Sequence, residues 1–263
     1  MNIVETMNVK VFGQGTTPML FAHGFGCDQS MWRFVTPAFE RSHKIVLFDL
    51  VGSGRSDLKA YSESRYGTLN GYAEDVLALC RELELKDVVF VGHSVSAMIG
   101  VLASIAEPSR FAALVLVGPS PCYIDDDAYV GGFTRPDIES LVESLDSNYL
   151  GWSRAIAPVI MGRPDRPELA DELTNSFCRT DPSIAKHFAR VTFLSDNRAD
   201  LPKVTKRALI LQCTNDVIAP RAVGEYCRAR MPKSELVMLE ATGHCPHLSA
   251  PDETIAAMRA FVG

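Results

Sequence analysis

A serine lies at the centre of the sequence Gly92-His93-Ser94-Val95-Ser96, and its neighbours are small enough for a sharp turn. The apolar run Val88–Val91 precedes the turn, and apolar residues at helical spacing follow it from Met98. Such a chain turns abruptly from strand to helix and presents a hydroxyl at the bend. The usual last residue is glycine, and Ser96 is a tolerable replacement. We predict that Ser94 is a nucleophile, which requires a base, an acid and an oxyanion site elsewhere.

Two residues complete the chain order serine, acid, histidine that this turn requires. Asp216 follows the apolar run Ala208–Leu211, and His244 follows the run Leu236–Leu239. We expect both on loops at the same sheet edge as Ser94. An imidazole activates the serine by taking its proton, and a carboxylate fixes the tautomer of that imidazole. The alternative is a turn-forming aspartate and a loop histidine without catalytic roles. Their joint order, each after its own strand, favours the triad.

An oxyanion site is predicted from two backbone N–H groups. One belongs to Val95, the residue after the nucleophile, and the other to Phe25 in His23-Gly24-Phe25-Gly26, which follows the apolar run Met19–Ala22. Glycines on both sides of Phe25 let this loop approach a substrate oxygen closely. His93 points away from the nucleophile if the turn forms, and we expect it to be structural.

Composition excludes several classes of protein. The formal charge of −6, from 26 basic and 32 acidic residues, is spread along the chain and argues against nucleic-acid binding. No run approaches the roughly 18 apolar residues of a membrane span. The first residues lack the pattern of a secretory signal. The seven cysteines form an odd set without a C-x-x-C pair, which predicts reduced thiols in a cytoplasmic protein.

The chain alternates short apolar runs with longer amphipathic stretches. Besides those above, the runs Ile45–Phe48 and Ala113–Val117 end at turn residues. Continuously apolar runs of this length are typical of parallel strands covered on both faces. A helix is expected after Thr68, and another is expected to end before Pro108. This alternation predicts an α/β fold with a mostly parallel, doubly wound sheet.

One region breaks the alternation. It holds helical stretches without a strand, separated by proline-rich joints, at Ile138–Leu145, Trp152–Ile160, Glu168–Phe177 and Ile184–Leu194. We predict a core formed by residues 1–122 and 196–263, with residues 123–195 inserted as a cap of about four helices. The cap is expected over the carboxyl edge of the sheet, where open α/β sheets bind ligands.

The motifs together resemble the α/β-hydrolase superfamily. They are His23-Gly24-Phe25-Gly26, Asp49-Leu50-Val51-Gly52-Ser53-Gly54-Arg55-Ser56, the turn at Ser94, Asp216 and Gly243-His244. Gly92-His93-Ser94-Val95-Ser96-Ala97-Met98 and Gly243-His244-Cys245-Pro246-His247-Leu248-Ser249-Ala250-Pro251 resemble its RsbQ-like branch. That branch holds bacterial stress-response hydrolases and the plant strigolactone and karrikin receptors. The resemblance covers nearly the whole chain.

The resemblance implies a hydrolase without a cofactor, with a small apolar pocket under the cap. It implies that the pocket aromatics are Phe25, Tyr123, Phe133, Trp152 and Phe193, for which packing of the cap core is the alternative. It also implies that some members act as ligand sensors with slow turnover and a protein partner. We therefore expect a serine esterase or lactonase for a small, largely apolar ester, the alternative being a ligand receptor acting through a regulatory protein.

Three other interpretations are less favoured. Gly52-Ser53-Gly54 lacks the third glycine of a dinucleotide loop. His244, Cys245 and His247 are spaced too tightly for a usual zinc site, and a metal would occupy the base. A hydrolase that cleaves carbon–carbon bonds would need a group for a substrate carboxylate, and the cap arginines are expected in solvent: Arg135, Arg154, Arg163 and Arg166. We therefore expect no metal.

Overall fold

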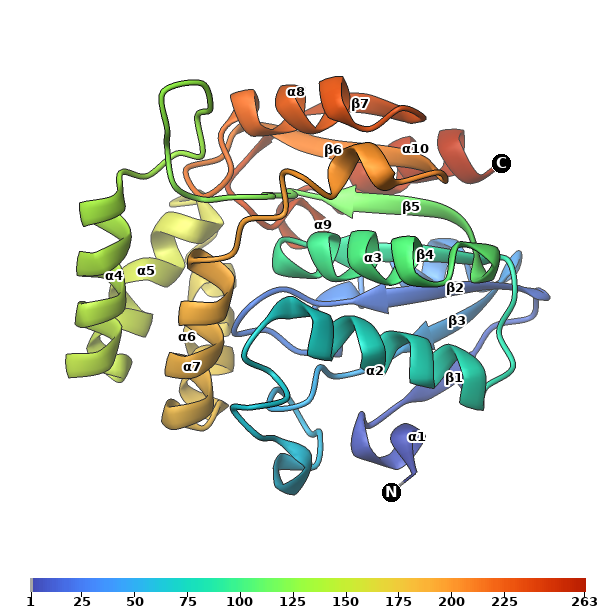
Figure 1. Ribbon diagram of the computed structural model, residues 1–263, viewed down its shortest axis with the longest axis horizontal. Coiled ribbons are helices and arrows are strands. Elements are labelled where there is room, and N and C mark those ends of the chain that lie inside the picture. Colours follow the sequence, from blue (N-terminus) through green and yellow to red (C-terminus); the bar gives the residue numbers. More distant parts are fainter. Residues whose placement is uncertain (1) are drawn as a thin grey trace.

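A seven-stranded β-sheet forms the centre of the molecule (Figure 1). The structure is a computed structural model that describes residues 2–263. Its strands are β1 (Lys10–Phe12), β2 (Thr17–Ala22), β3 (His43–Leu47), β4 (Val88–His93), β5 (Phe111–Val117), β6 (Arg207–Asn215) and β7 (Ser234–Thr242). Their order is β1-β3-β2-β4-β5-β6-β7, and every neighbouring pair is parallel except β1 with β3. The predicted sheet is confirmed.

The strands are longer than the apolar runs that predicted them. All six residues of β4 are buried, as a strand covered on both faces requires. β6 and β7 continue beyond their apolar runs to Asn215 and Thr242, which still pair with each other although the register shifts between Cys213 and Asn215. The three-residue edge strand β1 was not predicted, because Lys10 interrupts the apolar residues Val9, Val11 and Phe12 and leaves no continuous apolar run.

Helices cover both faces of the sheet, as Figure 1 shows. α1 (Ile3–Thr6), α2 (Leu69–Glu82), α3 (Val95–Ala106) and α8 (Arg221–Arg230) pack on one face, and α9 (Pro246–Ser249) and α10 (Pro251–Val262) lie toward the other. Successive strand residues feed opposite layers, so Leu114 belongs to the first core and Val115 to the second. As expected, α2 follows Thr68 and α3 ends before Pro108. Short 3₁₀ helices complete the connections: η1 (Gln29–Trp32), η2 (Thr36–Ala38), η3 (Leu58–Ala60), η4 (Pro108–Arg110) and η5 (Leu201–Lys203).

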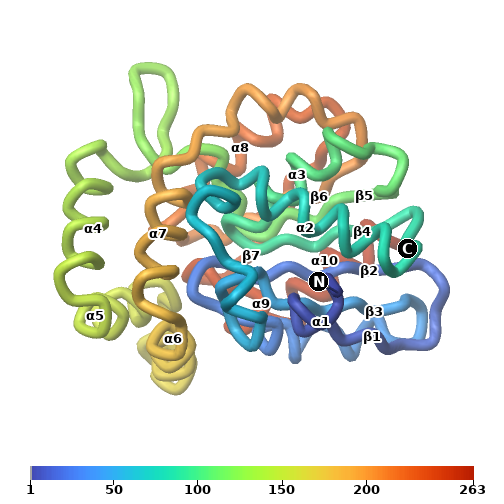
Figure 2. The backbone as a smooth tube through the Cα atoms, turned by 60° about the horizontal axis from the view of Figure 1, so that its bottom comes forward, coloured from blue at the N-terminus to red at the C-terminus, as the bar shows by residue number. Residues whose placement is uncertain are grey.

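Four helices lie between β5 and β6 along the chain. They are α4 (Arg135–Ser147), α5 (Tyr149–Met161), α6 (Pro167–Arg179) and α7 (Pro182–Phe193). They begin at typical signals: Thr134 and Asp137 form a capping box on α4, and the Asp181 side chain caps α7. Figures 1 and 2 show them together at one end of the molecule, toward which the strands point. We call residues 123–195, which include α4–α7, the cap.

The cap packs on the core through two apolar clusters. Phe177 and Phe193 of the cap share one cluster with Met31, Ile218 and Leu248 of the core. In the other, Phe188 of α7 packs on Tyr72 of α2. The chain leaves and returns side by side, because Cys122 pairs with Asp196 in an antiparallel bridge. This pairing supports the proposed cap boundaries at 123 and 195. In the part of the chain that the structure describes, every helix is too short or too polar to cross a membrane.

Candidate active site

Ser94 occupies a strained turn between β4 and α3. Its backbone has φ 56° and ψ −123°, a left-handed region that non-glycine residues rarely adopt. The Ser94 N–H donates to the Val117 carbonyl of β5 at 2.8 Å, which helps to hold the turn. Ser96, where glycine is usual, is fully buried, and its Oγ donates to the His23 carbonyl at 2.5 Å. The departure from glycine thus ties the turn to the loop that carries Phe25.

The structure brings Ser94, His244 and Asp216 together. His244 Nε2 lies 2.8 Å from Ser94 Oγ, and His244 Nδ1 lies 2.7 Å from Asp216 Oδ2. The ionised carboxylate only accepts, so Nδ1 carries the proton and Nε2 is free to accept from the serine. Asp216 Oδ1 accepts from the N–H groups of Ile218 and Ala219 at 2.8 and 3.1 Å. All three side chains are buried, which strengthens these interactions.

The strands place the two partners of the serine. Asp216 directly follows β6, and His244 follows β7 with only Gly243 between. The main chain of His244 is also fixed to the cap, because its N–H donates to the Ile160 carbonyl near the end of α5 at 2.7 Å. This contact uses a carbonyl that the helix end leaves without an intrahelical partner.

The two predicted oxyanion donors lie beside the nucleophile. Val95 is the first residue of α3, where backbone N–H groups have no intrahelical acceptor. The loop of Phe25 approaches from β2, and a Cβ at Gly24 would lie 3.3 Å from the Ser94 Cβ. The N–H of Phe25 takes part in none of the hydrogen bonds found in residues 2–263. This arrangement can stabilise a negative oxygen next to Ser94.

A narrow, mostly apolar cavity lies between Ser94 and the cap. Its wall is formed by Phe25, Cys27, His93, Ser94, Tyr123, Leu141, Trp152, Ile156, Ile160, Leu173, Phe177, Thr192, Phe193, Ile218, His244 and Cys245. The free space is about 30 Å³, room for about two water molecules. The Phe25 ring contacts four aromatic rings, those of Trp152, Phe177, Phe188 and Phe193, with centroids 5.6 to 6.3 Å away.

The aromatic residues named from the sequence have different positions. Phe25, Tyr123, Trp152 and Phe193 line the cavity, whereas Phe133 packs at the edge of the cap cluster and is not in the wall. Other wall residues were not found from sequence: Cys27, Leu141, Ile156, Ile160, Leu173, Phe177, Thr192 and Ile218. Helical periodicity on α5 and α7 marked a buried face, but it gave no sign of which buried residues border a cavity.

Few polar groups enter the cavity apart from the triad. The Tyr123 hydroxyl lies 3.5 Å from Ser94 Oγ, and burial raises the pKa of Tyr123 to about 12, so it stays protonated. Thr192 Oγ1 is buried and has no partner within residues 2–263. The cap arginines do not line the cavity; Arg163 and Arg166, for example, donate to the Ser249 carbonyl and pair with acidic neighbours.

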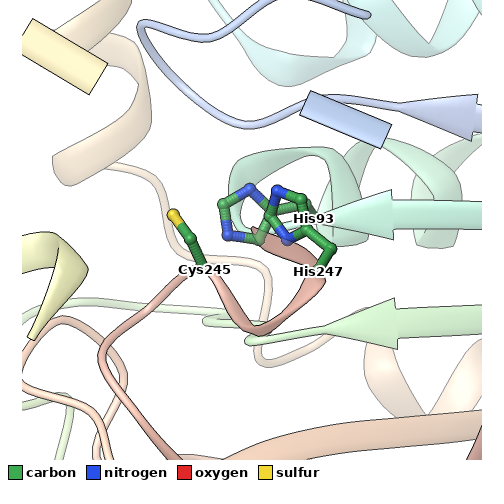
Figure 3. A group of neighbouring side chains, drawn as sticks. All are labelled: His93, Cys245 and His247. Atoms are coloured by element: carbon green, nitrogen blue, oxygen red, sulfur yellow. The ribbon is translucent and has the colours of Figure 1, made fainter. Parts of the chain in front are cut away.

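The potential metal ligands near the site are His93, Cys245 and His247 (Figure 3), rather than the set with His244 considered from the sequence. Their ligand atoms lie within 4.8 Å of one another. However, His93 Nε2 already donates to the His244 carbonyl at 2.8 Å. Burial also raises the pKa of Cys245 well above its ordinary value, which disfavours the thiolate that a metal needs. The trio is therefore a poor metal site.

Comparison with known proteins identifies the family. Residues 19–257 match the alpha/beta hydrolase family. The chain belongs to this family. It is 39% identical over 257 residues to the karrikin insensitive 2 receptor CA of Petunia hybrida, covering 97% of this chain and 95% of the relative. It is 37% identical over 259 residues to the strigolactone esterase D14 of Arabidopsis thaliana, covering 98% and 97%.

A solved structure is similar over nearly the whole length. A hydrolase from Oleispira antarctica superimposes with a TM-score of 0.97 at 42% identity, covering 99% of this chain and 96% of that one. These matches confirm the resemblance to the branch of the family that holds the strigolactone and karrikin receptors. They also confirm the predicted α/β-hydrolase fold, and they support the general prediction of a hydrolase without specifying its substrate.

Proposed function

We propose that the protein is a serine esterase or lactonase that hydrolyses a small, largely apolar ester through Ser94, His244 and Asp216. The observation that carries this proposal is the continuous hydrogen-bonded chain from Asp216 through His244 to Ser94, at 2.7 and 2.8 Å, facing an apolar cavity. No metal or cofactor is needed for this chemistry.

The reaction proceeds in two halves. Ser94 Oγ attacks the ester carbonyl while His244 Nε2 takes the hydroxyl proton, and the N–H groups of Val95 and Phe25 bind the resulting oxyanion. Collapse of the intermediate breaks the ester bond, and the leaving alcohol takes the proton from His244. Water then attacks the acyl-serine with His244 again as base, which releases the carboxylic acid and restores Ser94.

The cavity suggests the substrate class. Its wall is apolar except near Ser94, Tyr123 and Thr192, and none of the arginines and lysines in residues 2–263 belongs to it. An uncharged ester or lactone therefore fits better than a carboxylate-bearing diketone, so the carbon–carbon hydrolase is less favoured. The unpartnered Thr192 hydroxyl would pair with a second oxygen of the substrate.

The test is turnover of short p-nitrophenyl esters by the wild type and by Ser94→Ala and His244→Ala. We expect the variants to lose activity by about 10⁴-fold or more, because each removes a part of one catalytic unit. The matched control is Ser104→Ala, a buried serine on α3 whose Oγ donates only to Val101. Intact mass should show an acyl adduct on wild-type protein. Equal rates in wild type and Ser94→Ala would refute the proposal.

A second role is supported by the relatives named as receptors: the protein would sense its ligand and act through a regulatory protein partner, with turnover slow or absent. A ligand-dependent rise in the melting temperature together with ligand-dependent capture of a specific protein would support it. If no ester that the protein cleaves or binds gives either response, the esterase role stands without the sensing role.

The seven cysteines are free thiols, and we place the protein in a reducing cytoplasm.

A further inference from the structure

The imidazole of His93 binds the backbone of His244. His93 Nε2 lies 2.8 Å from the His244 carbonyl oxygen, although the two residues are 151 positions apart. Figure 3 shows the His93 side chain at the end of β4, between Cys245 and His247. The main chain of His244 is thus held from two sides, by His93 at its carbonyl and by the Ile160 carbonyl of α5 at its N–H.

The partners fix the protonation of His93. A carbonyl only accepts, so Nε2 must carry the proton, and Nδ1 is then the bare nitrogen. Nδ1 is buried and has no partner within residues 2–263, which agrees with this tautomer. Burial, with the nearby His247 and His244, holds the pKa of His93 well below its ordinary value, so the ring is neutral. A neutral ring with one committed proton is a poor acid or base but a stable hydrogen-bond donor.

Close packing leaves the His93 ring little freedom. Its centroid lies 5.0 Å from that of His244 and 4.5 Å from that of His247. On a further side, a Cβ at Gly24 would lie 2.5 Å from His93 Nδ1, so only glycine allows this approach. The ring therefore contacts the loop of the oxyanion donor Phe25 and the loop of His244, and it is the immediate neighbour of Ser94 in sequence.

We propose that His93 is a positioning residue that sets the backbone of His244, and with it the 2.8 Å contact between His244 Nε2 and Ser94 Oγ. This inference rests on the proposed function. Asp216 fixes the rotation of the His244 ring, but the position of the His244 backbone depends on the groups that bind its N–H and carbonyl. A shift of about 1 Å at the base is enough to lower a rate by about 100-fold.

In this proposal, the side chain at position 93 must place a hydrogen-bond donor where Nε2 of His93 lies. Glutamine offers an amide N–H at a similar distance from the backbone, whereas phenylalanine keeps a ring of similar shape without a donor. The pair His93→Gln and His93→Phe therefore separates the hydrogen bond from the packing.

The experiment measures kcat and KM for a p-nitrophenyl ester in the wild type, His93→Phe, His93→Gln and His247→Phe. His247 is the matched control, because it is an equally buried ring packed against His93 that does not line the cavity and, within residues 2–263, makes no side-chain hydrogen bond to His244. We expect His93→Phe to lower kcat about 10- to 100-fold with KM within about twofold. His93→Gln should recover most of this loss, and His247→Phe should keep kcat within about threefold.

A second readout does not depend on turnover. The proton between His244 Nδ1 and Asp216 gives a low-field NMR resonance, which we expect to broaden or shift in His93→Phe and to return in His93→Gln. Circular dichroism checks that each variant is folded; if His93→Phe does not fold, the comparison of His93→Gln with the wild type carries the test. Wild-type kcat in His93→Phe, or an equal loss in His247→Phe, would overturn the positioning role. Wild-type activity in Ser94→Ala would instead overturn the proposed function.

Discussion

His247 should make the fold sensitive to mild acid although it does not line the cavity. Its side chain is fully buried, and neither ring nitrogen has a hydrogen-bond partner within residues 2–263. Burial lowers the pKa of His247 from 6.5 to about 3. Below pH 6.5 the unfolded chain therefore binds a proton that the folded chain refuses until about pH 3. Stability is thus full above the unfolded pKa and falls as the pH drops through this window.

The size of the effect follows from the two pKa values. At pH 5 the unfolded state gains about RT ln(1 + 10^1.5), or about 2 kcal/mol, from protonation of one histidine. His93, whose pKa is also held well below its ordinary value by burial, adds to the same loss. His247→Phe removes only the first contribution. We therefore expect the wild type to lose about 2 kcal/mol more than His247→Phe between pH 7 and pH 5.

Urea unfolding, followed by circular dichroism at constant ionic strength, measures this double difference. Groups that titrate in both proteins and do not contact His247 cancel in the comparison. At pH 7 the substitution should be neutral or stabilising, because it removes a buried N–H without an acceptor. An equal pH dependence of the unfolding free energy in the two proteins would show that His247 is protonated as readily in the folded state as in the unfolded one.

Three substitutions test other contacts. Asp216→Asn should lower kcat by about 10⁴-fold with the fold intact, because an amide favours the wrong tautomer of the base; a smaller effect than tenfold in an ester assay would contradict this role. Ser96→Ala should cost about 1–2 kcal/mol in urea unfolding, since the buried His23 carbonyl loses its donor. Unchanged stability would show that the carbonyl finds another donor. Gly26→Ala places a Cβ 1.9 Å from Phe177 at φ 69°, and should lower the melting temperature and change KM more than kcat. An unchanged KM would mean that the Phe177 ring returns to the cavity wall.

The meeting of Ser94, Asp216 and His244 was predictable because each follows its own strand. Parallel strands bring their carboxyl ends to one edge, so the order of Ser94, Asp216 and His244 along the chain was enough to suggest that they meet. The sheet was predictable for a related reason, since buried strands leave continuous apolar runs. The edge strand β1 lacks that signal, because it spans only three residues and begins with the charged Lys10.

The cavity was less predictable because it depends on how the cap helices rotate against the core. Phe133 and Phe177 are both aromatic residues on cap segments, yet only Phe177 reaches the wall. The sequence also contained no indication of the hydrogen bond from His93 to the His244 carbonyl. Local spacing placed His93 away from the nucleophile, but the carbonyl that accepts its hydrogen bond lies 151 residues later.

The small free space beside Ser94 has a consequence for kinetics. About 30 Å³ holds about two water molecules, so an ester of ten or so heavy atoms must displace side chains of the wall before it binds. The observed binding rate should therefore level off at high ligand concentration, at the rate with which the wall opens. Trp152 lies in that wall and can report the event by its fluorescence in a stopped-flow experiment. A rate that rises linearly with concentration would mean that the wall yields faster than the ligand arrives. Saturation at a rate equal to kcat would mean that opening of the wall, rather than the chemistry at Ser94, limits turnover.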